Sequence, residues 1–117
     1  MKLIIRAGLA TFTLGLIMFN SIQVKAQSFD VCQVYGAVYE ADSPRNASFT
    51  IFLETSEAFA DLVVYQEDNR LMANESGHWF FTDKPSFAHF SIYFVSNRGL
   101  ADFSIYYTET LSFAGCK

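Results

Sequence analysis

A six-residue pattern recurs along this chain and constrains its fold more than any other feature. The pattern is alanine, a polar residue, phenylalanine or leucine, any residue, isoleucine or valine, and then tyrosine or phenylalanine. Four clear copies begin at Ala47, Ala60, Ala88 and Ala101; the first two are 13 residues apart, and so are the last two. Internal repeats of this kind are typical of folds built by stacking one small structural unit many times.

Each copy predicts a short β-strand, because its side chains alternate between two faces. In the copy that begins at Ala60, one face carries Ala60, Leu62 and Val64, and the other carries Asp61, Val63 and Tyr65. The abundance of β-branched and aromatic residues agrees with this prediction, and a helical period is absent.

Weaker copies extend the series of alanines to Ala73 and Ala114. The step from Ala73 to Ala88 is 15 residues and contains an insertion, residues 77–81, that reads as a strand of its own. With an opening strand over residues 34–39, we predict an all-β domain of about seven short strands. Periodicity alone favours an unknotted antiparallel meander or a small barrel.

The amino-terminal segment has the features of a secretory signal peptide. Lys2 and Arg6 precede an uncharged apolar run over residues 7–19, and small residues at Val24 and Ala26 fit a cleavage site. The run is shorter than the ~20 residues of a membrane-spanning helix. We therefore expect a signal peptide over residues 1–26, a single domain over residues 27–117, and export to the periplasm or the medium.

The charge of the expected mature domain restricts its partners. Residues 27–117 contain all 12 acidic residues and five basic ones, a formal net charge of −7. Nucleic acids and anionic membrane surfaces both require a basic footprint. We expect neither as a partner, and no contact with the membrane once the signal is removed.

The only two cysteines, Cys32 and Cys116, lie near the two ends of the expected domain. In an exported protein, an even number of cysteines indicates disulfide bonding. The pair has no C-x-x-C spacing and no histidine at ligand spacing, so a redox or metal site is not favoured. We predict a structural Cys32–Cys116 disulfide that closes almost the whole domain.

The polar residues that follow the alanines have two interpretations. These residues are Ser48, Asp61, Asn74, His89 and Asp102. As structural residues they could hydrogen-bond turn backbone, while the small alanine before them would let another segment cross closely. Alternatively, Asp61, His89 and Asp102 could coordinate a metal, but ligands should converge on one site rather than occur once per repeat. We therefore expect turn anchors and no bound metal or cofactor.

No catalytic motif stands out in the sequence. Nucleophile-elbow, zinc-protease, P-loop and dinucleotide-binding patterns are absent, and only His78 and His89 could act as bases at neutral pH. The least repetitive stretch is the insertion around His78 and Trp79, and insertions in repeat folds often mark a binding face. The simpler interpretation is a loop that caps the core with Trp79.

Several segments resemble the septoil-knot family, small bacterial proteins first described as a domain of unknown function. The segments that carry the resemblance are residues 32–36, 56–62, 97–106 and 112–116. The resemblance implies a small all-β domain whose backbone forms a seven-crossing torus knot, and no biochemical activity or catalytic residue comes with it. The predicted disulfide would then close the ends of the knot and block unthreading.

Two functional hypotheses follow. The first is a non-catalytic, monomeric binding or structural module, whose outer aromatic residues contact a protein or a carbohydrate. These residues are Phe52, Tyr65, Tyr93 and Tyr106. The second is a small exported hydrolase or enzyme inhibitor that uses the His78–Trp79 insertion. A pocket that joins His78 or His89 to a carboxylate within hydrogen-bond reach would favour the second hypothesis, and a scattered placement of the two histidines would remove it.

Overall fold

A computed structural model of the chain describes residues 29–116, and each repeat within it forms one strand followed by one tight turn. The predicted signal peptide lies outside the described residues. The strands are β1 (Gly36–Glu40), β2 (Phe49–Leu53), β3 (Leu62–Gln66), β4 (His78–Phe81), β5 (Phe90–Val95), β6 (Phe103–Thr108) and β7 (Gly115–Cys116). The predicted number of strands is confirmed, and the part of the chain that the structure describes contains no α-helix.

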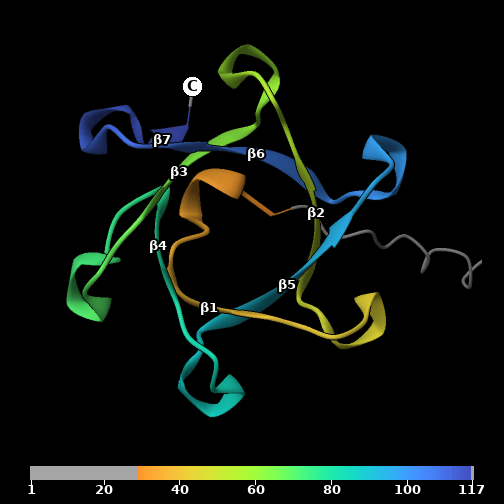
Figure 1. Ribbon diagram of the computed structural model, residues 1–117, viewed down its shortest axis with the longest axis horizontal. Helices are drawn as coiled ribbons and strands as arrows, with labels where there is room; N and C mark the ends of the chain where they lie inside the picture. The colour runs from red at the N-terminus through yellow and green to blue at the C-terminus, as the bar shows by residue number, and fades with distance from the viewer. Residues whose placement is uncertain (1–28, 117) are drawn as a thin grey trace, which may run out of the picture.

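Each strand is preceded by a single turn of 3-10 helix, which the sequence pattern did not predict. The turns are η4 (Val31–Gln33), η5 (Pro44–Asn46), η6 (Glu57–Phe59), η7 (Arg70–Met72), η8 (Pro85–Phe87), η9 (Arg98–Leu100) and η10 (Leu111–Phe113). From η5 onwards, the repeat alanine ends the turn and donates its backbone N–H to the first turn residue. In Figure 1 these six turns project outward from a ring of strands, whereas η4 lies within the ring outline.

Six strands form a closed ring in the order β4-β1-β5-β2-β6-β3, and the pairing of β3 with β4 closes it. All six pairings in the ring are parallel. The chain thus places β1, β2 and β3 at alternate positions in a first lap, and the second lap inserts β4, β5 and β6 between them. The sequence-based alternative of an antiparallel meander is wrong, because only the short β7 pairs antiparallel, with β3.

Parallel pairing follows from the length of the connections between paired strands. A parallel neighbour requires a long crossover, and a whole lap of the ring supplies it for every pair except β3–β4. Residues paired between the two laps accordingly recur at two sequence separations, 43 and 52, whereas those of the β3–β4 seam are 13 apart. The constant repeat length is what allows the second lap to keep its register against the first.

The apolar face of each repeat points into the ring and forms the core. Ile51, Leu62, Ile92 and Ile105 are fully buried there, which confirms the predicted inward face. Trp79 is also fully buried and donates its indole N–H to the carbonyl of Val34 at 2.9 Å. Trp79 is therefore a central core residue on β4, and the expectation that it caps the core from a loop is wrong.

Two glycines permit the closest backbone approach in the structure. Gly77 has φ of +81°, and a Cβ placed on it would lie 2.4 Å from the carbonyl oxygen of Val63 and 2.3 Å from the nitrogen of Gly115. Three segments therefore meet where β4 begins, at the seam that closes the ring. Any side chain at position 77 would force them apart.

A Cys32–Cys116 disulfide joins the turn before β1 to the last strand, with 5.4 Å between the two Cα atoms. β7 is only two residues long and pairs with β3 alone, so few backbone hydrogen bonds hold the carboxyl end. The disulfide fixes that end across a sequence separation of 84 residues.

No helix within residues 29–116 is long and apolar enough to cross a membrane.

Replacing both cysteines by serine should lower the stability of the domain substantially. A closed loop of this length contributes about 4–5 kcal/mol in the chain-entropy model, so the melting temperature should fall by at least about 10 °C. Differential scanning calorimetry of the double variant and of the reduced wild type would measure the change. Equal melting temperatures for the oxidised and fully reduced protein would contradict a stabilising role.

Candidate functional site

The polar residues after the repeat alanines form reciprocal hydrogen bonds with the other lap of the chain. In each case the backbone N–H of the polar residue bonds a partner carbonyl, and its side chain accepts the partner's backbone N–H. We call this arrangement a clasp. The four clasps join Ser48 to Ser91, Asp61 to Ser104, Asp102 to Thr50, and His89 to Ala37. Donor–acceptor distances within them run from 2.7 to 3.0 Å.

A third hydrogen bond completes each clasp. In three clasps, the partner's hydroxyl donates to the carbonyl two residues before the polar residue: Ser91 to Asn46, Ser104 to Phe59, and Thr50 to Leu100. Ala37 has no hydroxyl, and the guanidinium of Arg70 donates instead to the equivalent carbonyl of Phe87 at 3.1 Å.

The fourth clasp also explains a glycine. Ala37 donates its N–H to Nδ1 of His89, so this nitrogen is the unprotonated one, and the imidazole lies against Gly36. Gly36 has φ of +121°, and a Cβ there would lie 2.6 Å from the same nitrogen. The histidine takes the place of the side chain that Gly36 lacks.

The clasps correct the prediction that these residues anchor their own turns. Ser48, Asp61, His89 and Asp102 bond a strand 43 or 52 residues away. Four of the turns are capped by other side chains, with Asp30, Ser56, Asn69 and Asn97 accepting a backbone N–H two residues on, whereas η5, η8 and η10 have no side-chain cap. The metal interpretation of Asp61, His89 and Asp102 gains no support, because the described residues contain no group of three ligand-type side chains that could hold an ion.

His78, the histidine of the insertion, pairs with a carboxylate. Nδ1 of His78 lies 2.5 Å from Oε2 of Glu67, and both side chains are largely buried. The backbone N–H of Glu67 also bonds the carbonyl of Trp79. The pair sits on the β3–β4 seam that closes the ring. No described serine, threonine or cysteine side chain hydrogen-bonds His78, so the pair lacks a nucleophile, and the second histidine lies elsewhere, in the His89 clasp.

A second ion pair binds the end of β2 to η9. The guanidinium of Arg98 bonds both carboxylate oxygens of Glu54, at 2.7 and 2.9 Å, and lies 5.1 Å from the centre of the Phe52 ring. Glu54 is buried, whereas Arg98 stays largely exposed. These hydrogen bonds hold the pKa of the Glu54 carboxyl below its usual value of 4.5, although burial opposes the shift.

At the carboxyl ends of the strands, Tyr107 packs against Phe81, with 6.3 Å between the ring centres. Burial, and secondly the nearby charge of Glu40, raise the pKa of the Tyr107 hydroxyl well above its usual value of 10. Tyr107 is therefore neutral under all physiological conditions and contributes as an apolar wall rather than as a base.

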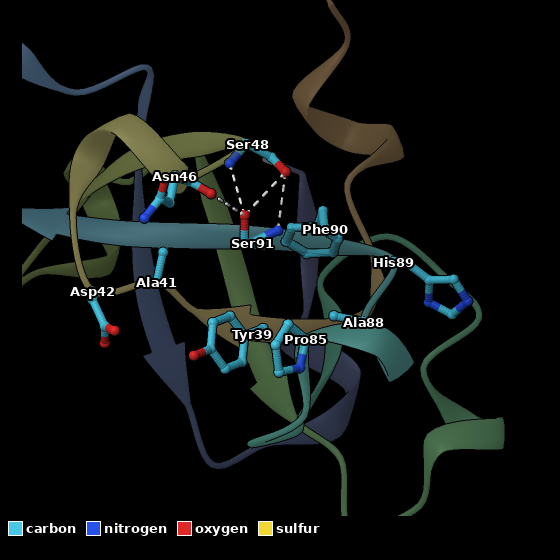
Figure 2. A pocket seen from close by; sticks show the side chains of 10 residues that line it. All are labelled: Tyr39, Ala41, Asp42, Asn46, Ser48, Pro85, Ala88, His89, Phe90 and Ser91. Carbon is cyan, nitrogen blue, oxygen red and sulfur yellow. Dashed lines mark hydrogen bonds between the residues drawn. The ribbon is translucent and has the colours of Figure 1, made fainter.

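A groove of about 480 Å³ lies beside the Ser48–Ser91 clasp, between the segments around η5 and η8 (Figure 2). Its walls are Tyr39, Ala41, Asp42, Asn46, Ser48, Pro85, Ala88, His89, Phe90 and Ser91. Figure 2 shows the Tyr39 ring beside Pro85, with Asn46 and the clasp serines above them and the His89 ring turned away.

The polar groups of this groove differ in what they can still bind. The Ser48 and Ser91 hydroxyls are occupied within the clasp. Within the described part of the chain, the Asp42 carboxylate, the Asn46 amide and the Tyr39 hydroxyl have no hydrogen-bond partner. Aromatic rings, here Tyr39 and Phe90, beside two polar side chains without hydrogen-bond partners are a common composition for a site that binds a small polar molecule.

The sequence did not point to this groove. Tyr39, Asp42 and Asn46 belong to the opening strand and its linker, where the sequence indicated only turn chemistry. The predicted outer aromatics Phe52, Tyr65, Tyr93 and Tyr106 are half-buried, and none of them lines it. Two linkers that are 40 residues apart become neighbours only because β1 and β5 pair.

Fold and site together define a small, disulfide-closed β protein with a ring of parallel strands wound in two laps. A family model described as the 7(1) septoil knot domain matches residues 31–117. The chain belongs to the septoil knot domain family, which confirms the resemblance seen in the sequence. No curated protein and no solved structure matches the chain.

Replacing Asp102 by alanine should destabilise the domain by about 1–2 kcal/mol, because the backbone N–H of Thr50 loses its acceptor. Asparagine should restore part of the loss, since its amide oxygen can still accept the N–H. Urea unfolding measures each value, and Asp42→Ala, which removes an exposed and unpartnered carboxylate, is the matched control. Equal stability of Asp102→Ala and wild type would argue against the clasp.

Replacing Arg98 by glutamine should destabilise the domain at neutral pH and much less in acid. Because the pKa of Glu54 is depressed on folding, its stabilising effect is complete above about 4.5 and is lost as the pH falls through the lower folded value. The difference between wild type and Arg98→Gln should therefore shrink as the pH falls below 4.5. Arg45→Gln serves as the control, and a pH-independent difference would contradict the assignment.

Proposed function

We propose that this protein is an exported, non-catalytic binding module and that the groove in Figure 2 holds its ligand. The observation that carries the proposal is the Tyr39 ring together with the Asp42 carboxylate and the Asn46 amide, two groups with no hydrogen-bond partner in the described part of the chain. The ligand class that fits is a neutral saccharide. Its C–H face would pack on the tyrosine ring, and its hydroxyls would donate to the carboxylate and exchange hydrogen bonds with the amide.

The charge of the groove supports a neutral ligand rather than an anion. No lysine or arginine lines it, and Asp42 would repel phosphate, sulfate or a carboxylate. Its rigid walls also support binding: β1 and β5 are paired along one side, and the Ser48–Ser91 clasp fixes η5 against β5. A preformed groove loses little conformational freedom when a ligand enters.

The export that we propose is supported by the structural disulfide and by the amino-terminal sequence. The Cys32–Cys116 bond persists in oxidising compartments, and the apolar run at the amino terminus supplies the signal. We expect the chain to be secreted into the periplasm or the medium. Amino-terminal sequencing of the exported protein should find residue 27 as the new amino terminus.

We also propose that the backbone of this chain is a seven-crossing torus knot. The interleaved order of the two laps supports it, because every second-lap strand enters between two first-lap strands. The family description points the same way.

Pulling the reduced chain from residues 29 and 116 in a force experiment tests the knot. A knotted chain should stop short of the ~3.6 Å per residue that a free extended chain reaches. Extension to the full contour length would refute the knot without affecting the ligand proposal.

Saccharide binding to the oxidised domain should depend on the groove residues. We expect a glycan array, followed by calorimetric titration of the best hit, to show binding that Tyr39→Ala or Asp42→Ala weakens at least about tenfold, or about 1.4 kcal/mol. Tyr93→Ala replaces the equivalent tyrosine of another repeat outside the groove and should bind normally. Absence of any saccharide ligand, or equal loss in Tyr93→Ala, would reject the proposal.

A further inference from the structure

One copy of the repeat contains a cation site with which the next copy can be compared. At the end of β2, the ring of Phe52 and the carboxylate of Glu54 together hold the guanidinium of Arg98. An aromatic face and a carboxylate that bind one guanidinium are a combination that favours arginine over lysine, because the planar fork can stack and pair simultaneously. In this copy, the protein supplies its own cation.

The next copy, 13 residues later, has the aromatic ring but no arginine. Phe52, Glu54 and Arg98 correspond to Tyr65, Glu67 and Leu111. Leu111 is 51% exposed, and Glu67 is already paired with His78. The sequence counterpart of Arg98 is therefore uncharged, although the imidazole of His78 lies beside both Glu67 and the Tyr65 ring, with 6.3 Å between the two ring centres.

The space around this second copy is a double groove along the end of β6. Two adjoining hollows of about 340 and 390 Å³ share Tyr107, Thr108 and Glu109. The remaining wall residues are Tyr65, Gln66, Asp68, Glu57, Tyr106, Thr110 and Phe113. No lysine or arginine lines either hollow, and Phe113 is 57% exposed.

Two carboxylates of this groove are not neutralised by the protein itself. Asp68 and Glu109 have no hydrogen-bond or ion-pair partner within residues 29–116, and they approach the groove from the ends of paired strands, where Tyr65 lies opposite Thr108. The corresponding positions of the filled copy are Thr55 and Ser96, which carry no charge. The second copy thus has two more carboxylates than the filled copy, and Leu111 stands where the filled copy has its arginine.

We propose that the double groove docks a basic segment of a protein partner, with an arginine side chain against Tyr65 between Asp68 and Glu109. The charge of the groove and the Arg98 site identify the guanidinium, and the exposed apolar ring of Phe113 extends the contact to a neighbouring side chain of the segment. This site is separate from the saccharide groove, so the two proposals succeed or fail independently.

A peptide titration of the oxidised domain, followed by NMR, tests the proposal. The probe is the blocked tripeptide Gly-Arg-Gly, and its matched control carries citrulline, which keeps the shape of arginine but has no charge. We expect saturable shifts of the Tyr65 ring and the Thr108 amide with arginine and none with citrulline. The double variant Asp68→Asn and Glu109→Gln should weaken binding at least about tenfold, whereas Glu75→Gln should leave it unchanged.

A variant that fills the site provides the sharpest control. Leu111→Arg places an arginine where Arg98 stands in the filled copy, and it should abolish peptide binding while the domain remains folded. Shifts that are equal with citrulline, or binding that survives either Leu111→Arg or the double carboxylate variant, would overturn the proposal. Dimerisation that the double variant removes would also overturn it, by assigning the groove to a second copy of this chain.

Discussion

Reciprocal hydrogen bonding between the two laps is the interaction on which the rest of this structure depends. Sequence neighbours such as β1 and β2 are not paired, because β5 lies between them. Every strand pair in the ring except the β3–β4 seam therefore joins segments from different laps. The clasps add side-chain acceptors to the ladder at the point where each strand begins, and so fix which residue of one lap faces which residue of the other.

The clasp also explains the composition of the repeat. The second position must present an acceptor to a partner N–H, and serine, aspartate and unprotonated histidine all do so. The partner strand supplies a hydroxyl, from Ser91, Ser104 or Thr50, to reach back to the turn. Where the partner is Ala37, Arg70 provides the missing donor from a different repeat. The clasps therefore differ in residue type but keep the same set of hydrogen bonds.

The strands could be predicted from the sequence, but the 3-10 turns before them and the pairing of the strands could not. Alternation in residues 60–65 identifies a strand and its inward face because those properties depend only on adjacent side chains. Parallel closure depends on which residues lie 43 and 52 positions apart, and no local pattern encodes that choice. Trp79 illustrates the limit: the sequence indicated a short strand over the insertion and a capping role for Trp79, whereas the closing of the ring places its indole at the centre of the core.

The candidate sites share this dependence on long-range pairing. The saccharide groove combines the linkers after β1 and before β5, and the double groove combines the ends of β3 and β6. Asp42 and Asp68 belong to no motif of the sequence, and their separate roles follow from the strands that the laps bring beside them.

Amide hydrogen exchange on the oxidised domain tests most directly whether the clasps hold the two laps together. The amides of Ala37, Thr50, Ser91 and Ser104 each donate to a clasp side chain, and several lie near the surface. If the laps separate only on global unfolding, these four amides should exchange at the rate of the buried β-strand amides. Exchange as fast as that of the exposed turn amides would show that the laps are held by core packing alone.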